Sequence, residues 1–303
     1  MPKLLSFAAA LLIALSSASA RSAEPEAQVL VVVGPSSHPP GSHEVAAGGR
    51  LLAHALEHSD NLRGVQAEVV TDWPQDRKRL DAIATVVFIG DTFPPMRMPQ
   101  SENIMQELAV MTARGCGIVC LHYATGLRAE DVAADGEHPL LHWMGGYFAT
   151  RCNHHQSIAK IFPAATITSA ASGHPVSRGW TEFTLHDEPY INNYFGPEGN
   201  KLAPGVVAFA TSQLPPEGPK TEIVAWGVQR PDGGRGFGIV MPHFYKNWAL
   251  DDLRTFILNG VVWTAKVDVP KNGVRTAKPD LAMFAPASIE PKPREAKPRP
   301  AKK

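Results

Sequence analysis

Residues 117–126 read Gly-Ile-Val-Cys-Leu-His-Tyr-Ala-Thr-Gly, and this stretch decides the fold class. An unbroken apolar run between glycines is typical of a strand that is buried on both faces, as in parallel sheets. The run ends at His122 and Tyr123. Because open α/β sheets bind their ligands beyond the carboxyl ends of the strands, the stretch also predicts a site at this point.

Similar apolar runs recur along the chain and alternate with segments of helical periodicity. Strands are predicted at residues 28–34, 66–70, 84–90, 221–227 and 236–241, and helices from Val45, at 102–114 and at 250–265. Ser42 and Ser101 are expected to cap the first two helices, and Gly115 should end the second in a left-handed conformation. This alternation predicts an α/β fold with a doubly wound, mostly parallel sheet.

The rhythm of strands and helices breaks between residues 129 and 221. Short β-like pieces remain at 157–162, 165–168 and 206–210. We interpret them as an elaborated edge of the same sheet and not as a second domain.

Composition excludes several classes of protein. The chain has 303 residues, of which 44% are hydrophobic and 19% charged, so it is able to bury a large core. It has 29 basic and 29 acidic residues, and this balance argues against a general nucleic-acid-binding protein. No GxSxG, GxGxxG or P-loop motif is present in the sequence.

Both ends of the chain differ from its middle. Lys3, the apolar run 4–15 and the small residues up to Ala20 predict a signal peptide that is cleaved after Ala20. The apolar run is too short to span a membrane, so we expect a periplasmic or secreted protein. Residues 21–27 form a linker and 28–267 the domain. Residues 268–303 are expected to be a disordered tail, because their end is rich in Pro, Lys and Arg.

The three cysteines are interpreted as buried thiols. Cys116 and Cys120 lie too far apart on one predicted strand for a normal disulfide, and there is no CxxC pair for a zinc ribbon. Cys120 lies inside the apolar run and not on a sharp turn after it. A nucleophilic role for Cys120 is therefore not predicted.

Polar side chains follow most of the predicted strands. They are His38, His43, Glu44, Asp72, Asp91, His122, Tyr123 and His243. If the strands are parallel, these groups converge on one edge of the sheet. Each has an ordinary alternative: a surface-loop histidine, a helix-capping aspartate or a core histidine. The coincidence of histidines past three strand ends is what favours a site.

Two later segments are dense in polar and aromatic groups. One contains Asp187, Glu188 and Tyr190. The other contains His154 and His155, of which at most one would face the site if both lay on a strand.

The chemistry of such a site stays open at this level. His38, His43, His122 and His243 are candidate ligands for a divalent metal such as zinc, although no HExxH motif is present. The same groups would suit sugar binding or acid–base catalysis.

The chain resembles the ThuA-like (trehalose-utilisation) family over residues 28 to about 266. The matching motifs are Ser-His-Pro-Pro-Gly-Ser-His-Glu at 37–44, Gly-Ile-Val-Cys-Leu-His-Tyr-Ala at 117–124, Trp-Met-Gly-Gly-Tyr-Phe at 143–148, His-Pro-Val-Ser-Arg-Gly at 174–179, Asp-Glu-Pro-Tyr at 187–190, Ala-Trp at 225–226, Arg-Pro-Asp-Gly-Gly-Arg-Gly-Phe-Gly at 230–238, Pro-His-Phe at 242–244 and Trp248. The resemblance implies a flavodoxin-like sheet of the class I glutamine amidotransferase type. It also implies a role in carbohydrate metabolism, beside a sugar oxidoreductase, and no glutaminase activity, because the family lacks the amidotransferase cysteine.

Two functional hypotheses follow. The first is an exported enzyme, hydrolase- or isomerase-like, that acts on a glycoside or oxidised sugar. Its catalytic residues would be His122, His243, Glu44 and Tyr123, and its substrate-binding residues His38, His43, Asp187, Glu188, Tyr190 and Trp248. The second is a sugar- or metal-binding module without turnover.

Overall fold

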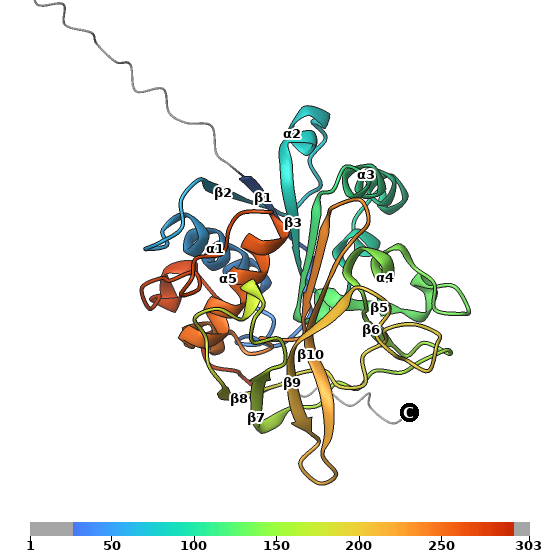
Figure 1. Cartoon of the computed structure of the whole chain (residues 1–303). Coiled ribbons are helices and arrows are strands. Elements are labelled where there is room, and N and C mark those ends of the chain that lie inside the picture. The colour runs from blue at the N-terminus through green and yellow to red at the C-terminus, as the bar shows by residue number, and fades with distance from the viewer. Residues whose placement is uncertain (1–26, 294–303) are drawn as a thin grey trace, which may run out of the picture.

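A nine-stranded sheet forms the centre of the computed structural model, which describes residues 27–293 (Figure 1). The strand order is β2-β1-β3-β4-β11-β10-β9-β7-β8. The bounds are β1 Ala27–Val33, β2 Val65–Val70, β3 Ile83–Ile89, β4 Gly117–Leu121, β7 Phe162–Ser169, β8 Phe183–Asp187, β9 Val206–Leu214, β10 Lys220–Gln229 and β11 Arg235–Ile239.

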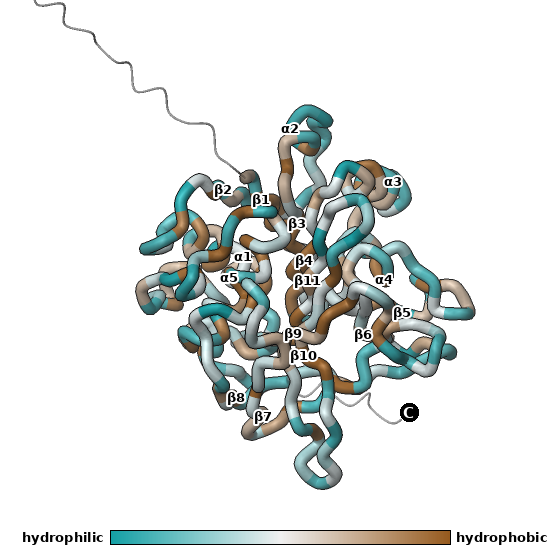
Figure 2. Tube along the Cα trace, in the orientation of Figure 1, coloured by the Kyte–Doolittle hydropathy of each residue, from teal (hydrophilic) through white to brown (hydrophobic). Residues whose placement is uncertain are grey.

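The first five strands of this order form a parallel half-sheet. Their order, β2-β1-β3-β4-β11, is the order of flavodoxin-like sheets. β4 is buried along its whole length, as its apolar sequence predicts, and the hydrophobic colouring of Figure 2 is concentrated on these central strands. Their carboxyl ends therefore share one edge of the sheet.

The other half of the sheet is antiparallel, so the sheet is mixed, and the prediction of a mostly parallel sheet was wrong in this half. β10 pairs antiparallel with both β11 and β9, and β7 pairs antiparallel with β9 and β8. The reason lies in the connections. Only the five residues between Gln229 and Arg235 join β10 to β11, whereas a parallel connection needs a long crossover.

Helices cover both faces of the sheet (Figure 1). α1 (Val45–Glu57) and α5 (Asp251–Thr264) lie on one face, and α3 (Ser101–Ala113) and α4 (Pro139–Met144) on the other, while the short α2 (Arg77–Ala82) precedes β3. Gly115 follows α3 with φ 87°, as predicted. The predicted serine caps were wrong: α1 begins after Glu44 and α3 after Gln100, and neither has a side-chain cap.

The segment between β4 and β10 extends the sheet, as expected, but with different elements. β5 (Gly126–Arg128) and β6 (Phe148–Thr150) form a separate two-stranded sheet. Residues 157–161 do not form the predicted strand and contribute only the isolated bridge between Ile158 and Ile191. β7, β8 and β9 lengthen the main sheet.

The packed part of the chain extends beyond the predicted boundary at residue 267. Val269, Val274, Leu281 and Phe284 are buried, so the expectation of a disordered tail was wrong for residues 268–293. The sequence gives no signal for this packing, because the segment is mostly irregular and its apolar residues show no periodicity. The predicted signal peptide, residues 21–26 of the linker and residues 294–303 lie outside the described residues. Within the described residues, no helix has the length and apolar character needed to cross a membrane.

Candidate metal centre

Three imidazole rings meet at the carboxyl edge of the parallel half-sheet. His43 follows β1, His122 follows β4 directly and His243 follows β11. His122 Nε2 lies 2.9 Å from His43 Nε2 and 3.1 Å from His243 Nδ1, and His43 Nε2 lies 3.0 Å from His243 Nδ1. Three of the histidines predicted from the strand ends thus come together at one point.

Hydrogen bonds behind two of the rings determine which nitrogen carries a proton. His43 Nδ1 lies 2.6 Å from Asp91 Oδ1, and His122 Nδ1 lies 2.9 Å from the carbonyl oxygen of Val240. Both partners only accept hydrogen bonds, so both Nδ1 atoms donate and both Nε2 atoms present lone pairs. Two lone pairs that face each other at 2.9 Å repel, unless a proton or a cation lies between them.

The backbone at both residues is left-handed. His43 has φ 46° and His122 has φ 48°, a region that residues other than glycine avoid. Such strain costs roughly 1–3 kcal/mol per residue and is concentrated at functional sites. It directs both side chains into the centre of the cluster.

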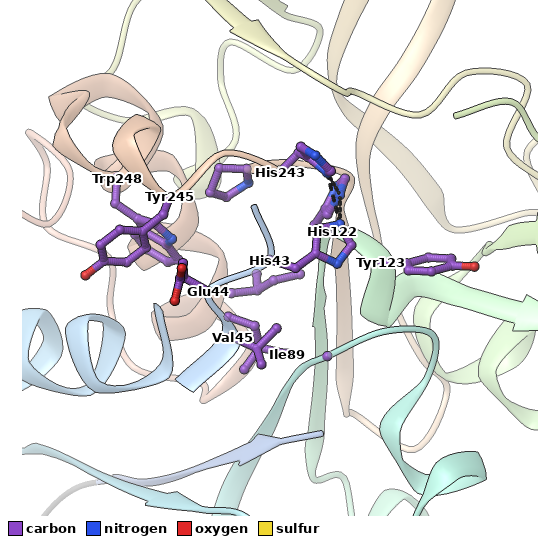
Figure 3. A pocket seen from close by; sticks show the side chains of 12 residues that line it. His43, Glu44, Val45, Ile89, His122, Tyr123, His243, Tyr245 and Trp248 are labelled. Atoms are coloured by element: carbon purple, nitrogen blue, oxygen red, sulfur yellow. Dashed lines mark hydrogen bonds between the residues drawn. The ribbon is translucent and has the colours of Figure 1, made fainter. Parts of the chain in front are cut away.

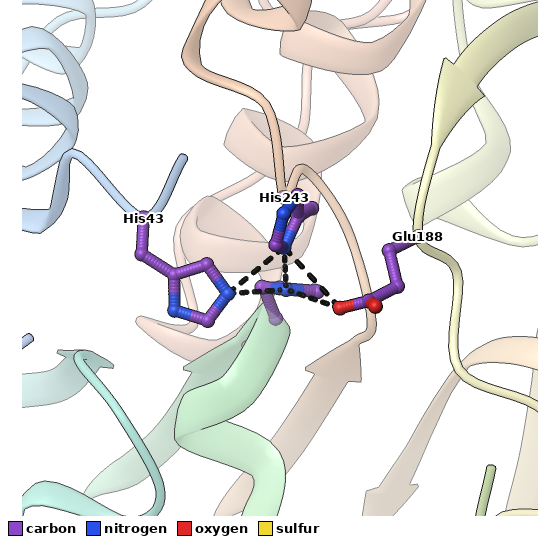
Figure 4. Close-up of side chains that lie close together, drawn as sticks. His43, Glu188 and His243 are labelled. Carbon is purple, nitrogen blue, oxygen red and sulfur yellow. Dashed lines mark hydrogen bonds and ion pairs between the residues drawn. The ribbon is translucent and has the colours of Figure 1, made fainter. Parts of the chain in front are cut away.

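A carboxylate and a phenol complete the cluster from the other half of the sheet. Glu188 follows β8, and its Oε2 lies 3.3 Å from His243 Nδ1 and 4.0 Å from His122 Nε2. The Tyr190 hydroxyl lies 3.0 Å from His122 Nε2. Figure 4 shows His43, His243 and Glu188 converging on one point, and the ligand atoms of these three residues and His122 all lie within 4.8 Å of one another.

Burial keeps the three rings neutral. It lowers the pKa of His43, and, together with the neighbouring imidazoles, it lowers the pKa of His122 well below the ordinary value and that of His243 to about 3. Burial, with the nearby Asp187 carboxylate, raises the pKa of Glu188 to about 7. Neutral imidazoles are the form that binds metals.

Asp187 connects the Glu188 segment to the loop after β11 that carries His243. Its Oδ1 accepts hydrogen bonds from the backbone N–H groups of Glu188 (2.7 Å) and His243 (2.8 Å), and its Oδ2 accepts one from Asn247 Nδ2 (3.0 Å). Burial raises the pKa of Asp187 to about 6, although these hydrogen bonds lower it. The sequence predicted that Asp187 binds substrate. In the structure Asp187 is fully buried, and its hydrogen bonds hold the two segments of the site together.

His38 and Asp91 form a layer beside the cluster. The His38 ring stacks on the His43 ring with centroids 3.5 Å apart, and its Nδ1 lies 3.0 Å from both oxygens of Asp91. Burial alone would raise the pKa of Asp91, but the hydrogen bonds from His38 and His43 bring it below the usual range. Asp91 therefore stays ionised and orients both rings. Tyr123 packs edge-on against the same two rings.

Several predicted residues lie away from the cluster. The Glu44 carboxylate accepts hydrogen bonds from three backbone N–H groups and lies beside Tyr245 (Figure 3). Trp248 is buried against Gly48. His154 Nε2 pairs with the Tyr147 hydroxyl and His155 Nε2 with the carbonyl of Asn192. Asp72 is exposed after β2. Among the described residues, none of them has a hydrogen bond or ion pair with the three rings, although Glu44 and Trp248 line a small space next to the rings.

Two spaces adjoin the cluster, one behind it and one in front. The space behind, drawn in Figure 3, has a volume of about 20 Å³, which is enough for one water molecule only. The groove in front has a volume of about 430 Å³ and is lined by His38, Glu188, His243 and Pro291–Pro293, among others. Ligand pockets commonly measure about 300–1,000 Å³. A small ligand would therefore approach from the groove.

The donor set fits a zinc ion. Tetrahedral zinc with Zn–N bonds of about 2.0–2.1 Å requires nitrogens about 3.3 Å apart. The three imidazole nitrogens are separated by 2.9–3.1 Å, so only small side-chain movements are needed to hold the ion. Hydrogen bonds from Nδ1 to a carboxylate and to a backbone carbonyl are the usual support behind metal-bound histidine.

The sequence pointed to Glu188 but assigned it a different role. It was predicted to bind substrate, whereas His38 was predicted as the fourth possible ligand. In the structure the His38 Nδ1 atom contacts both carboxylate oxygens of Asp91, and Glu188 takes the fourth place in the cluster. The only signal for this was the density of polar and aromatic groups around Asp187, Glu188 and Tyr190.

Comparisons with known proteins agree with this fold. The family model described as ThuA, trehalose utilisation, matches residues 28–264. A solved ThuA-like protein from Bacteroides uniformis ATCC 8492 is 14% identical, with a TM-score of 0.57, covering 84% of this chain and 96% of that chain. One from Parabacteroides merdae ATCC 43184 is 16% identical, with a TM-score of 0.52, covering 82% and 95%. A comparison with curated proteins finds no match. At these identities the likeness to solved structures concerns the fold alone.

Proposed function

The chain belongs to the ThuA (trehalose utilisation) family, and we propose that it is a divalent-metal-dependent enzyme that acts on a small-molecule carbohydrate. His43, His122 and His243 would bind the metal, with Glu188 as a fourth ligand, and zinc is the metal that best suits this set. The family description supports the carbohydrate, and the donor set supports the metal.

One observation carries the proposal. The Nε2 lone pairs of His43 and His122 face each other at 2.9 Å, and each is fixed in that state by an acceptor behind its ring. In an ordinary core, buried histidines pair with donors or acceptors and do not direct lone pairs at one another. A cation at the centre converts this repulsion into coordination.

The reaction class follows from the positions of the remaining groups. A bound divalent metal would polarise a carbonyl or hydroxyl oxygen of the sugar. His38 and Glu188 line the groove from which the sugar would approach, and the Tyr190 hydroxyl adjoins His122. We propose a hydrolase- or isomerase-like reaction on a glycoside or an oxidised (keto) sugar, in which these groups bind the hydroxyls and transfer protons.

Glutaminase activity is not part of the proposal. Cys120 is fully buried in β4, and burial raises the pKa of its thiol well above the ordinary value. A buried neutral thiol is a poor nucleophile. The proposal also includes export to the periplasm or beyond, and a sugar oxidoreductase that supplies a keto-sugar substrate.

A second candidate function is a binding module without turnover. Three histidines and a carboxylate would fill all four positions of a tetrahedral ion, which is typical of structural sites, whereas catalytic sites keep one position open. Glu188 Oε2 lies 3.3 Å from His243 Nδ1 and 4.0 Å from His122 Nε2, farther than the ring nitrogens lie from one another. This favours the enzyme, because substrate could replace the more distant carboxylate as the fourth ligand.

The test begins with metal content. The protein, purified without chelator, should contain about one zinc or similar ion per chain, and zinc should raise its melting temperature. The metal-loaded protein would then be incubated with trehalose, glucose and their 3-keto forms, in parallel with calorimetry. Product formation supports the enzyme, and binding without product supports the module. A protein that takes up no divalent metal would refute both metal-dependent readings.

A further inference from the structure

We propose that residues 281–293, here called the C-terminal strap, position His43 for metal binding and form one wall of the substrate groove. The inference rests on the proposed function of the same site. The strap lies beyond residue 264, where the family match ends, so it is an addition to the matched domain. The loop that it contacts, residues 38–44, is here called the histidine loop.

Glu44 is the main connection between the strap and the histidine loop. Its Oε1 accepts hydrogen bonds from the N–H groups of Gly41 (2.8 Å) and Ser288 (3.0 Å), and its Oε2 accepts one from that of Ala287 (2.8 Å). One carboxylate therefore joins both segments through the residue next to His43. Both oxygens are needed, because an amide would direct an N–H group at a backbone N–H.

The backbones of the two segments also touch. Lys292 N–H donates to the Pro40 carbonyl oxygen at 2.9 Å, and a side chain at Gly41, where φ is 85°, would collide with the Glu290 carbonyl. The Glu290 carboxylate forms an ion pair with Lys246 at 2.9 Å. The strap therefore lies directly on the histidine loop.

The beginning of the strap is anchored independently of the loop. Leu281 and Phe284 are buried, the Leu281 carbonyl accepts a hydrogen bond from the Tyr245 hydroxyl at 3.1 Å, and the Phe284 carbonyl accepts one from Arg50 at 2.6 Å. The strap is thus fixed to the domain before it reaches the loop, and it is able to transmit that rigidity to the loop.

His43 needs such support because its backbone is left-handed. On one side its N–H donates to the His243 carbonyl at 2.9 Å. On the other side, Glu44 is held by the strap. A residue in this region of φ and ψ keeps its conformation only where the surroundings determine it. Glu44 is therefore a positioning residue for His43 and not a catalytic one.

The end of the strap reaches the groove. Pro291, Lys292 and Pro293 line the same 430 Å³ space as Glu188 and His243. Release of the strap should therefore alter both the metal site and the groove.

The experiment compares Glu44→Gln with Glu57→Gln. Glu57 lies at the other end of α1, and its carboxylate also accepts a hydrogen bond from a backbone N–H group, that of Ala67. Both full-length variants would be titrated with Zn²⁺ and Co²⁺, and amide hydrogen exchange would be measured. Glu44→Gln should weaken metal affinity about tenfold or more, as the loss of a supporting contact does. It should also change the visible Co²⁺ spectrum and speed up exchange in the strap and in residues 42–45. Glu57→Gln should match the wild type.

Each other outcome has a definite meaning. Faster exchange in the strap with unchanged metal affinity and spectrum would overturn the proposal, as would unchanged exchange. If Glu44→Gln does not fold, Gly41→Ala, which pushes the strap away from the loop, is judged by the same measurements. If the wild type binds no metal, the proposed function fails. Exchange at residues 42–45 in Glu44→Gln then decides alone whether the strap holds the loop.

Discussion

The parallel and antiparallel halves of the sheet supply different chemistry to one site. The parallel half contributes His43, His122 and His243, all neutral, past the ends of its strands. The antiparallel half contributes Glu188 and Tyr190, although β8 lies four positions away from β11 in the strand order. The fold must therefore bring the end of β8 back to the parallel edge, and hydrogen bonds from Glu188 and His243 to Asp187 hold it there. The position of the three histidines follows from the parallel topology, because the strands end at one edge. The position of Glu188 depends on how the antiparallel half of the sheet folds back towards that edge.

The largest effect should come from the parallel half. We expect His122→Ala to weaken zinc binding by two to three orders of magnitude, because structural zinc binding of about 10–16 kcal/mol over four ligands gives about 3 kcal/mol per ligand. Turnover of a keto-glycoside should disappear. The melting temperature of the metal-free protein should change little, since one of the two rings whose lone pairs face each other is removed. Calorimetric titration and thermal melts would show whether the variant instead simply unfolds, in which case His122 is a core residue.

A smaller effect should come from the antiparallel half. Glu188→Gln keeps the shape of the side chain and removes its charge, so we expect zinc affinity to fall about tenfold while the three imidazoles still bind. The matched control is Glu182→Gln. Glu182 directly precedes β8, and its carboxylate accepts a hydrogen bond from the Thr168 hydroxyl. If Glu188→Gln binds zinc as tightly as the wild type, Glu188 lines the substrate groove and does not bind the metal. The metal ligands would then all come from the parallel half of the sheet.

Tyr190→Phe should have the smallest effect on the metal. The hydroxyl donates to His122 Nε2, whose single lone pair is the one that would bind zinc, so this hydrogen bond exists only in the metal-free protein. A neutral hydrogen bond contributes about 1 kcal/mol, so its loss should raise zinc affinity by about fivefold or less. Turnover should nevertheless fall if the hydroxyl transfers a proton. A large loss of zinc affinity, or unchanged turnover, would contradict this separation of roles.

A buried histidine outside the site provides a reference for the cluster. His138 caps α4 by accepting a hydrogen bond from the Leu140 N–H, and burial lowers its pKa to about 4. Since the unfolded chain binds the proton more tightly, the stability that His138 contributes is complete above pH 6.5 and declines as the pH falls towards 4. We expect the wild type to lose about 2 kcal/mol more than His138→Asn between pH 7 and 5, from the difference in pKa.

This effect would be measured by urea denaturation at both pH values. Asparagine keeps a capping oxygen without titrating in this range. Metal affinity at pH 7 should not change in His138→Asn. If the free energy of unfolding changes equally with pH in the wild type and in His138→Asn, the fold does not depend on the neutral state of His138.

The parallel half was predictable from sequence because each of its features is local. An apolar run that ends at polar residues indicates both a buried strand and the edge at which it ends. His122 follows its run at once, His243 comes just after Pro242, and His43 lies in the loop beyond the first run, so all three were expected at the same edge. The antiparallel pairing of β10 and β11 was also accessible, because the Pro-Asp-Gly-Gly sequence at 231–234 is typical of a tight turn and is too short for a parallel crossover.

The remaining features depend on contacts between distant segments. Glu44 follows His43 in sequence, yet the start of α1 turns its carboxylate towards Ala287 and Ser288, more than 240 residues later. Glu188 reaches the cluster only because β8 folds back. The strap buries Leu281 and Phe284 without any periodic pattern. None of these contacts leaves a local signature in the sequence.

The left-handed backbone at His43 and His122 has a consequence for how this chain is able to diverge. Glycine is the residue that would relax φ 46° and φ 48° without strain, and it has no ligand. A lineage under selection for thermal stability alone would therefore move away from histidine at these two positions. Their persistence in a descendant would record selection for activity, because the two histidines lie where stability and function favour different residues.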